Sequence, residues 1–224
     1  GKSRLVTCNE SIDITEEIFK NFKPEKVPFV IVVANPVEVI SYITQKITGL
    51  PKQNVVGTGT FLDSIRMNYV VKETNDNITS VDAIMLGEHG TTAFLCEELS
   101  TINDLPFSTI FDQDTIEELV TSVKASAEEI KETQKATIYG VSYCAIKIFE
   151  ALLSDKAQCF PVSTYLPKSL KILVGETDVY LSLYAEISKK GIYPIENYHP
   201  NQNGLKHFQK SIELITPCIP KKYV

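Results

Sequence analysis

The sequence contains no apolar run long enough to cross a lipid bilayer, so it does not predict a membrane protein. Its longest apolar run covers residues 27–34, whereas a membrane-spanning helix needs about 20 apolar residues. No apolar segment follows the polar residues 1–4, so no secretory signal is expected. Positive charge is also scarce, since 22 Lys and Arg face 28 Asp and Glu and the formal net charge is −6. Nucleic acids and anionic membranes attract basic surfaces, so neither is expected as the main partner.

Paired cysteines and clustered histidines are missing as well. The five cysteines are an odd number, lie far apart and form no Cys-x-x-Cys motif. This pattern is typical of reduced thiols in a cytoplasmic protein rather than of a disulfide framework. The three histidines also lack the spacing of zinc ligands. We therefore expect a cytoplasmic location and no metal site.

What is present is the composition of an ordinary globular protein. Of the 224 residues, 43% are hydrophobic and 22% are charged, which is enough apolar material for a sizeable core. At roughly 150 residues per domain, the chain holds one large or two small domains. This composition excludes a disordered or fibrous chain.

The first 50 residues follow the pattern helix, buried strand, helix. Residues 11–22 have the apolar spacing of an amphipathic helix. The β-branched run at 27–34 is typical of a strand buried on both faces of a parallel sheet. Pro36 suits the first turn of a second helix, which runs to about Thr48. This order is that of the end of a doubly wound α/β domain, which binds ligands at the carboxyl ends of its strands, where Asn35 stands.

The glycine fingerprint of a dinucleotide-binding domain is absent from the sequence. The only Gly-x-Gly is Gly57-Thr58-Gly59, and position 62 holds Leu rather than a third glycine. We therefore expect residues 1–50 to be the last portion of such a domain and residues 51–224 to form an α+β domain. In the second part the pattern predicts helices at 60–71, 112–134, 138–153 and 203–215 and strands at 54–56, 79–86, 162–166 and 179–187.

Three residues of the second part are candidates for chemistry. His89 lies between two glycines on an open turn, where its near-neutral pKa suits proton transfer. Asp63 and Arg66 are three residues apart on a predicted helix and share a face. Asp63 could therefore orient His89, while the planar fork of Arg66 suits a carboxylate. Taken alone, His89 fits a solvated loop histidine equally well, and the pair fits a surface salt bridge.

Three further positions are ambiguous in isolation. Asn35 fits either a turn former or a ligand of a bound molecule. Arg4 lies in a polar stretch and fits a solvated charge, and Thr137 fits a junction between two helices.

Taken together, these segments resemble the L-lactate/malate dehydrogenase family, and its bacterial-type L-lactate dehydrogenases most closely. The resemblance rests on residues 35–39 (Asn-Pro-Val-Glu-Val), 57–66 (Gly-Thr-Gly-Thr-Phe-Leu-Asp-Ser-Ile-Arg) and 86–90 (Leu-Gly-Glu-His-Gly), which match in order and spacing. Residues 3–5 resemble the end of that family's mobile active-site loop, and residues 136–140 the segment that closes its substrate pocket. The implied fold is α/β: the C-terminal end of a Rossmann-type doubly wound parallel sheet, followed by the family's α+β catalytic domain.

The resemblance implies an NAD-dependent oxidoreductase that transfers a hydride between the cofactor and C2 of a small 2-oxo or 2-hydroxy acid. In such an enzyme His89 exchanges a proton with the substrate oxygen, and Asp63 orients His89. Arg66 grips the substrate carboxylate, and Arg4 polarises the carbonyl group. The other implied contacts are those of Asn35 with substrate and cofactor, Thr58 and Val141 with the nicotinamide, and Thr137 with the substrate side chain.

The resemblance also bears on substrate, regulator and assembly. Thr137 leans towards the lactate enzymes, so pyruvate is the expected substrate, with malate or a bulkier 2-hydroxy acid as the alternative. Allosteric bacterial lactate dehydrogenases bind fructose 1,6-bisphosphate through an arginine and a histidine, whose places here hold Asn68 and Asp82. Neither side chain neutralises a phosphate, so no activation by that effector is expected. The family implies a homotetramer, with a homodimer as the alternative.

A function of another class stays open at this point. A non-catalytic, oligomerising interaction domain would keep the fold without a nucleotide site, and the missing glycine fingerprint favours it. The joint presence of Arg4, Asp63, Arg66 and His89 favours an enzyme instead. We expect the enzyme, and we expect residues 1–224 alone to be inactive because half of the cofactor site is not among them.

Overall fold

The computed structural model describes residues 4–22, 28–134 and 138–224, apart from the side chains of residues 4–7 and 127–134. The helices are α1 (Arg4–Asn21), α2 (Val37–Thr48), α3 (Phe61–Thr74), α4 (Phe107–Ile110), α5 (Gln113–Gln134), α6 (Tyr139–Leu153), α7 (Lys168–Val174) and α8 (Gln202–Ile215). The strands are β1 (Val30–Val32), β2 (Val55–Gly57), β3 (Val81–Asp82), β4 (Met85–Leu86), β5 (Phe94–Leu95), β6 (Thr101–Ile102), β7 (Leu105–Pro106), β8 (Gln158–Tyr165), β9 (Tyr180–Ser188) and β10 (Gly191–Pro194).

A mixed five-stranded sheet in the order β1-β2-β8-β9-β10 forms the centre of the molecule. β1 and β2 are parallel, with Val30 opposite Val55 and Val32 opposite Gly57, and the remaining neighbours are antiparallel. Parallel strands end at the same edge of a sheet, so the segments that follow β1 and β2 meet there. This edge carries Asn35 and Thr58, two of the residues singled out above.

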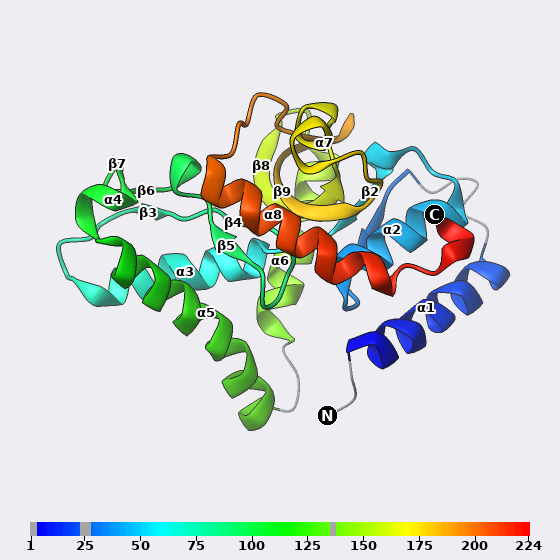
Figure 1. Ribbon diagram of the computed structural model, residues 1–224, viewed down its shortest axis with the longest axis horizontal. Helices are drawn as coiled ribbons and strands as arrows, with labels where there is room; N and C mark the ends of the chain where they lie inside the picture. The colour runs from blue at the N-terminus through cyan, green and yellow to red at the C-terminus, as the bar shows by residue number, and fades with distance from the viewer. Residues whose placement is uncertain (1–3, 23–27, 135–137) are drawn as a thin grey trace.

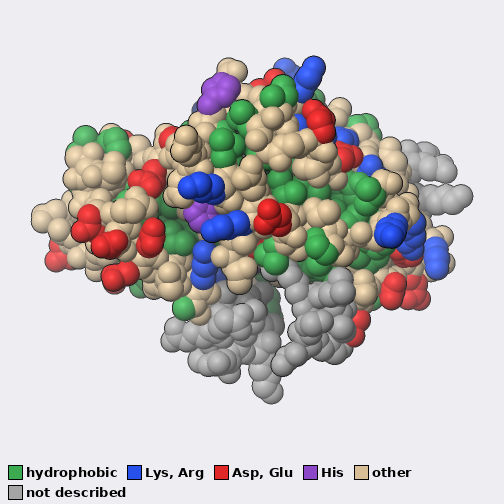
Figure 2. Space-filling view, in the orientation of Figure 1, with side chains coloured by type: hydrophobic (Ala, Val, Ile, Leu, Met, Phe, Trp, Pro, Cys, Tyr) green, Lys and Arg blue, Asp and Glu red, His purple; other side chains and the backbone are tan. Residues whose placement is uncertain are grey.

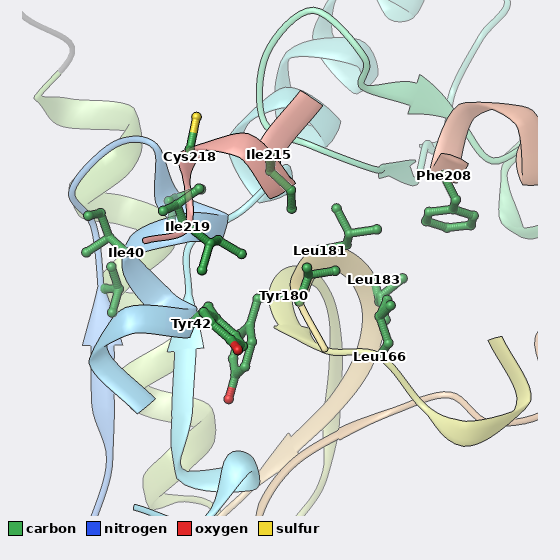
Figure 3. Packing of buried hydrophobic residues seen from close by; sticks show 14 of the residues in the cluster. Ile40, Tyr42, Leu166, Tyr180, Leu181, Leu183, Phe208, Ile215, Cys218 and Ile219 are labelled. Carbon is green, nitrogen blue, oxygen red and sulfur yellow. The ribbon is translucent and has the colours of Figure 1, made fainter. Parts of the chain in front are cut away.

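Helices cover the sheet and extend beyond it. Figure 1 shows α8 crossing in front of the sheet, while α5 and α1 diverge on opposite sides of the molecule with α6 between them. The largest apolar cluster joins α1, α2, α7 and α8 to the sheet. Figure 3 shows its centre, where Tyr42 of α2 and Tyr180 of β9 meet edge to face with ring centroids 6.4 Å apart. Two smaller clusters pack α5 against α3 and α6 against β8 and β9.

The predicted elements are present, with corrected bounds. The helices expected at 112–134, 138–153 and 203–215 match α5, α6 and α8 within one residue at each end. The helix expected from residue 11 begins at Arg4. The run at 79–86 forms two short strands, β3 and β4, rather than one. α4, α7, β5, β6, β7 and β10 were not predicted.

Burial of two strands differs from the prediction for a topological reason. The run at 27–34 was predicted to be buried on both faces, but the described strand is Val30–Val32 and Val33 is 42% exposed. β1 is an edge strand among the described residues, so one side lacks cover. Conversely, β9 was predicted to be half-buried but is buried along most of its length, because it lies between two strands and both α2 and α6 pack against it.

No helix among the described residues is long and apolar enough to cross a membrane.

Candidate active site

His89 and Asp63 form a short hydrogen bond at the edge of the molecule's interior. His89 Nδ1 lies 2.6 Å from Asp63 Oδ2. A carboxylate accepts and does not donate, so Nδ1 carries the proton and Nε2 is the nitrogen left for a ligand. The Asp63 side chain is 10% exposed and that of His89 is 24% exposed. The imidazole is thus anchored on one side and accessible on the other.

Arg66 completes the cluster from the same helix as Asp63. The two residues stand three apart on α3, and Arg66 Nη1 lies 3.6 Å from Asp63 Oδ1. The Arg66 side chain is 12% exposed. A guanidinium that is mostly buried keeps its charge and presents several donors in a plane, which matches the geometry of a carboxylate.

The pKa of His89 is raised above its ordinary value of 6.5. Burial alone would lower it, but the hydrogen bond and the charge of Asp63, helped by the charge of Glu38, outweigh burial and the opposing charge of Arg66. The raised pKa favours the positively charged imidazolium, which is able to donate a proton from Nε2.

The loop that carries His89 is fixed to β9 through its main chain. Gly87 and Ser182 pair as an isolated antiparallel bridge, with N–H···O distances of 3.0 and 2.8 Å. The N–H of His89 donates to Glu38 Oε1 at 3.0 Å, and the Ser182 hydroxyl donates to the same oxygen at 2.9 Å. Glu38 lies in the first turn of α2 and is 1% exposed. Burial raises the pKa of this carboxyl group.

A second set of contacts fixes α3, and with it Asp63 and Arg66, to the strand that leads into the His89 loop. The Thr60 hydroxyl donates to the carbonyl of Met85. The N–H of Met85 donates to Ser64 Oγ at 2.8 Å, and the N–H of Thr60 donates to Ser182 Oγ at 3.1 Å. These buried contacts set the distance between the two halves of the cluster.

Asn35 and Thr58 stand at the carboxyl edge of the parallel pair of strands, as predicted. Asn35 is exposed, precedes a cis peptide bond to Pro36, and accepts a hydrogen bond from Ser11 Oγ at its main-chain oxygen. Thr58 is 5% exposed, and its N–H donates to the carbonyl of Val32. The two residues therefore lie on one side of the site.

The first turn of α6 lies against the start of α3. A Cβ atom on Gly140 would lie 2.7 Å from Leu62 Cδ1, so α6 passes close to the residue before Asp63. Val141 follows in the same turn and is partly buried. Burial, assisted by the charge of Asp63, raises the pKa of the Cys144 thiol to about 12, so this thiol stays protonated.

Two of the predicted site residues are not placed. Thr137 lies outside the described residues, and so does the side chain of Arg4, whose main chain begins α1.

Sequence reasoning missed the buried polar residues behind His89, namely Glu38, Thr60, Ser64 and Ser182. A signal was present for Glu38, because it is the one acidic residue in a helix whose first eight residues are all buried. The serines and threonines gave no such signal, since their partners come from distant parts of the chain.

The charge distribution around the site is uneven. Figure 2 shows acidic side chains gathered over the start of α5, while lysines surround a histidine nearer the centre of the same face. Between α5 and α8 lies a cavity of about 180 Å³, lined by Phe94, Lys124 and His207 among others. Neither His89 nor Asp63 lines this cavity, although Lys124 donates to the carbonyl of Thr91, two residues after His89, at 3.0 Å.

The described residues thus bring together a histidine oriented by a buried carboxylate and a mostly buried arginine, near the carboxyl edge of a parallel strand pair. Comparison with known proteins defines the class. Residues 60–221 match the family described as lactate/malate dehydrogenase, alpha/beta C-terminal domain. The chain belongs to the lactate/malate dehydrogenase family.

Sequence identities and structural superpositions with individual relatives measure how similar the chain is to members of this family. The chain is 32% identical over 210 residues to L-lactate dehydrogenase 2 of Lactobacillus johnsonii, covering 92% of this chain and 67% of that protein. It superposes on the malate dehydrogenase of Aeropyrum pernix with a TM-score of 0.89 and 25% identity, covering 100% of this chain and 73% of that one. For the minor L-lactate dehydrogenase of Enterococcus mundtii the TM-score is 0.86 and the identity 26%, over 97% of this chain and 71% of that one. The fold is therefore the α/β catalytic fold of this family, preceded by the end of its Rossmann-type sheet.

Proposed function

We propose that this chain carries the substrate-binding and proton-transfer part of an NAD-dependent L-lactate dehydrogenase, which interconverts pyruvate and L-lactate. The observation that carries the proposal is the 2.6 Å hydrogen bond between His89 Nδ1 and Asp63 Oδ2, with Arg66 beside it. This arrangement leaves one acidic N–H and one planar cation available to a 2-oxo acid.

Proton transfer falls to His89. When bound, NADH supplies the hydride that reaches C2 of the substrate. His89 Nε2–H donates its proton to the keto oxygen as that oxygen gains negative charge, and the neutral imidazole takes the proton back in the reverse direction. Asp63 keeps Nδ1 protonated throughout and stabilises the positively charged ring. Because Asp63 is nearly buried, little solvent screens this stabilisation.

Substrate orientation falls to Arg66. The chain contains only two arginines, Arg4 and Arg66, against 20 lysines. Lysine serves as the cation everywhere else, so the planar fork is retained only at two positions that the resemblance assigns to the substrate. We assign Arg66 to the substrate carboxylate and Arg4 to the carbonyl oxygen. Thr137 would face the substrate side chain.

The residues at the strand edge fit a nicotinamide. Asn35 is exposed at the end of β1 with its side-chain amide available, and Thr58 lies at the end of β2. An amide, a hydroxyl and the aliphatic Val141 suit a flat ring that carries a carboxamide group. We assign these three residues to the nicotinamide half of NAD. We keep the boundary between the cofactor and substrate domains near residue 50, where Gly49 ends α2 with a φ of +65°.

The substrate proposal is tested by steady-state kinetics with NADH. The full-length protein used for this test is the polypeptide that joins residues 1–224 to the rest of the cofactor domain expected above. We expect kcat/KM for pyruvate to exceed that for oxaloacetate and for 2-oxoisocaproate. A preference for oxaloacetate would make the protein a malate dehydrogenase. Absence of turnover with all three acids, together with absence of saturable NADH binding, would favour the non-catalytic interaction domain instead.

A polypeptide of residues 1–224 alone should not turn over. The sequence contains no Gly-x-Gly-x-x-Gly, so half of the cofactor contacts would be lacking. The 1–224 polypeptide would be purified on an affinity column to remove host enzyme. Turnover by the natural sequence that is lost in His89→Asn would contradict this expectation.

We also propose a cytoplasmic location, which five free cysteines favour.

Fructose 1,6-bisphosphate should not activate the enzyme. Asn68 Oδ1 accepts a hydrogen bond from the N–H of Ala83 at 2.8 Å, so this side chain is already engaged within the fold. Asp82 carries a carboxyl group that would repel a phosphate. A large fall in KM for pyruvate on addition of the bisphosphate would contradict the assignment.

We propose that the protein is a homotetramer, with a homodimer as the alternative. The exposed face of α6 supports an oligomer, because Tyr139, Tyr143, Ile146, Phe149 and Leu153 are each more than half exposed at helical spacing. Sedimentation equilibrium of the full-length protein measures its mass directly. A monomer would refute the proposal.

A further inference from the structure

We propose that Glu38 is a positioning residue for His89: its carboxylate accepts a hydrogen bond from the main chain of His89, and the Ser182 hydroxyl holds that carboxylate in place by donating to it. The proposal rests on the proposed function, because it names the residues that hold the proton donor in place. Glu38 and Ser182 are both buried, so neither is assigned a contact with substrate.

Glu38 Oε1 connects α2 to the His89 loop. This single oxygen accepts from the N–H of His89 at 3.0 Å and from Ser182 Oγ at 2.9 Å. The contact with His89 is made by its main chain and crosses 51 positions of sequence. Helix α2 is therefore tied directly to the residue that carries the imidazole.

Ser182 connects Glu38 to the start of α3. Its hydroxyl accepts from the N–H of Thr60, the residue before α3, at 3.1 Å, while its main chain pairs with Gly87. A Cβ atom on Gly59 would lie 2.6 Å from Ser182 Oγ, so only glycine permits this approach. Ser182 thus contacts the segments that lead to His89 and to Asp63.

Glu38 and Ser182 are both buried. Glu38 is 1% exposed and Ser182 is 0% exposed, and Glu38 Oε2 has no hydrogen-bond partner among the described residues. A carboxyl group in such a place is costly unless it is neutral or well paired. A hydrophobic side chain would avoid this cost but would leave the N–H of His89 without the acceptor that Glu38 supplies. His89 is the titratable group that faces Glu38, and its charge favours the carboxylate without overcoming the effect of burial on the pKa.

Asp63 and Glu38 therefore position different parts of His89. Asp63 fixes the ring and its protonation through the side chain, and Glu38 fixes the Cα position of His89 through the main chain. A displacement of this main chain would lengthen the 2.6 Å bond between Nδ1 and Asp63, while Arg66 on α3 would stay in place.

Three variants of the full-length protein test the proposal. Glu38→Gln keeps the shape and the accepting oxygen, so we expect kcat for pyruvate reduction within about threefold of the natural protein. Glu38→Ala removes the acceptor, so we expect kcat to fall at least about tenfold while KM for pyruvate changes less than about threefold. Ser182→Ala should give an intermediate loss. Ser41→Ala is the matched control, because Ser41 is a fully buried polar residue of the same helix whose hydroxyl has no hydrogen-bond partner among the described residues.

A second measurement does not depend on turnover. In Glu38→Ala, NMR titration of His89 should show a pKa closer to the ordinary 6.5 than in the natural protein, and the pKa in Ser41→Ala should be unchanged. If Glu38→Ala fails to fold, the comparison of Glu38→Gln with Ser182→Ala decides. Equal losses in Glu38→Gln and Glu38→Ala, or full activity in Glu38→Ala, would overturn the proposal. If the natural protein lacks turnover, the proposed function fails and the titration alone decides the role of Glu38.

Discussion

At the scale of single residues, the site depends on an arginine and a histidine that share one carboxylate. Asp63 Oδ2 accepts from His89, and Asp63 Oδ1 faces Arg66. One buried anion therefore orients both groups that the proposal assigns to the substrate. When His89 is protonated, two positive charges face the single negative charge of Asp63. The cluster then has a net positive charge, which suits an anionic 2-oxo acid.

Arg66→Lys should raise KM for pyruvate at least about tenfold and leave KM for NADH nearly unchanged. Lysine keeps the charge but loses the planar fork that binds a carboxylate through two hydrogen bonds. Steady-state kinetics of the full-length protein provide the measurement. Lys72→Ala, which removes an exposed cation from the same helix, is the control. An unchanged KM for pyruvate in Arg66→Lys would remove the carboxylate assignment.

At the scale of elements, the turn after β2 shows how closely backbones approach at the site. Gly59 has a φ of +53°, and a Cβ atom there would lie 2.5 Å from Ser163 N and 2.9 Å from Val162 C. Those atoms belong to the main chain of β8 and cannot move aside. The glycine lets Thr60 and α3 start beside β8 and β9.

Gly59→Ala should destabilise the fold by about 2–4 kcal/mol, because it combines an unfavourable φ with a clash against main-chain atoms. Gly49→Ala isolates the first effect: Gly49 has a φ of +65° and no atom within 4 Å of its Cβ position. We expect it to cost about 1 kcal/mol. Urea denaturation followed by circular dichroism measures both. Equal losses in the two variants would show that the close approach to β8 is absent.

The local sequence pattern predicted the long helices closely but missed several short elements and the division of the run at 79–86 into two strands. The 22 residues of α5 and the 15 of α6 have sustained apolar periodicity, which sequence reports directly. Strands of two residues such as β4 and β5 are fixed by pairing with each other, which periodicity does not reveal. Burial of β1 and β9 depends on their places in the sheet order, and local sequence carries no information on that order.

Sequence analysis likewise found some residues of the candidate site and missed others. Sequence paired Asp63 with His89 through the family resemblance, and the geometry of the described residues agrees. Glu38 and Ser182 escaped notice because they act through contacts that span 51 and 144 positions. Their side chains face the interior, where a single sequence shows only an acid and a serine of no fixed purpose.

At the scale of the whole molecule, ion pairs on the outer surface join distant elements. Asp178 precedes β9 and contacts Lys46 of α2 at 3.2 Å, Lys52 at 2.6 Å and Lys171 of α7 at 3.2 Å. Partial burial alone would raise the pKa of Asp178, but the hydrogen bonds and charges of the three lysines lower it from 3.8 to about 2.

Asp178→Asn should therefore reduce stability at neutral pH and have progressively less effect as the pH falls through about 2. The folded-state pKa lies below the unfolded one, so the contribution is fully present above about pH 4 and is lost as the pH falls towards 2. The side chain is 38% exposed, and after allowance for solvent screening we expect about 1 kcal/mol. Thermal unfolding between pH 2 and 7 provides the test. Asp155→Asn, which breaks a single exposed pair with Lys189, is the control and should change little. A loss that persists undiminished at pH 2 would contradict the electrostatic explanation.

The central claim is that Asp63 holds His89 in its protonated, proton-donating form. The most direct test is the pH dependence of kcat/KM for pyruvate reduction by the full-length protein, measured for the natural sequence and for Asp63→Asn. His89 must be protonated to donate, and its pKa is raised, chiefly because the bond and charge of Asp63 outweigh burial. We expect kcat/KM to fall only at a pH above 6.5 in the natural protein, and this fall to be displaced to lower pH in Asp63→Asn. Identical profiles in the two proteins, or a natural rate that rises with pH through this range, would contradict it.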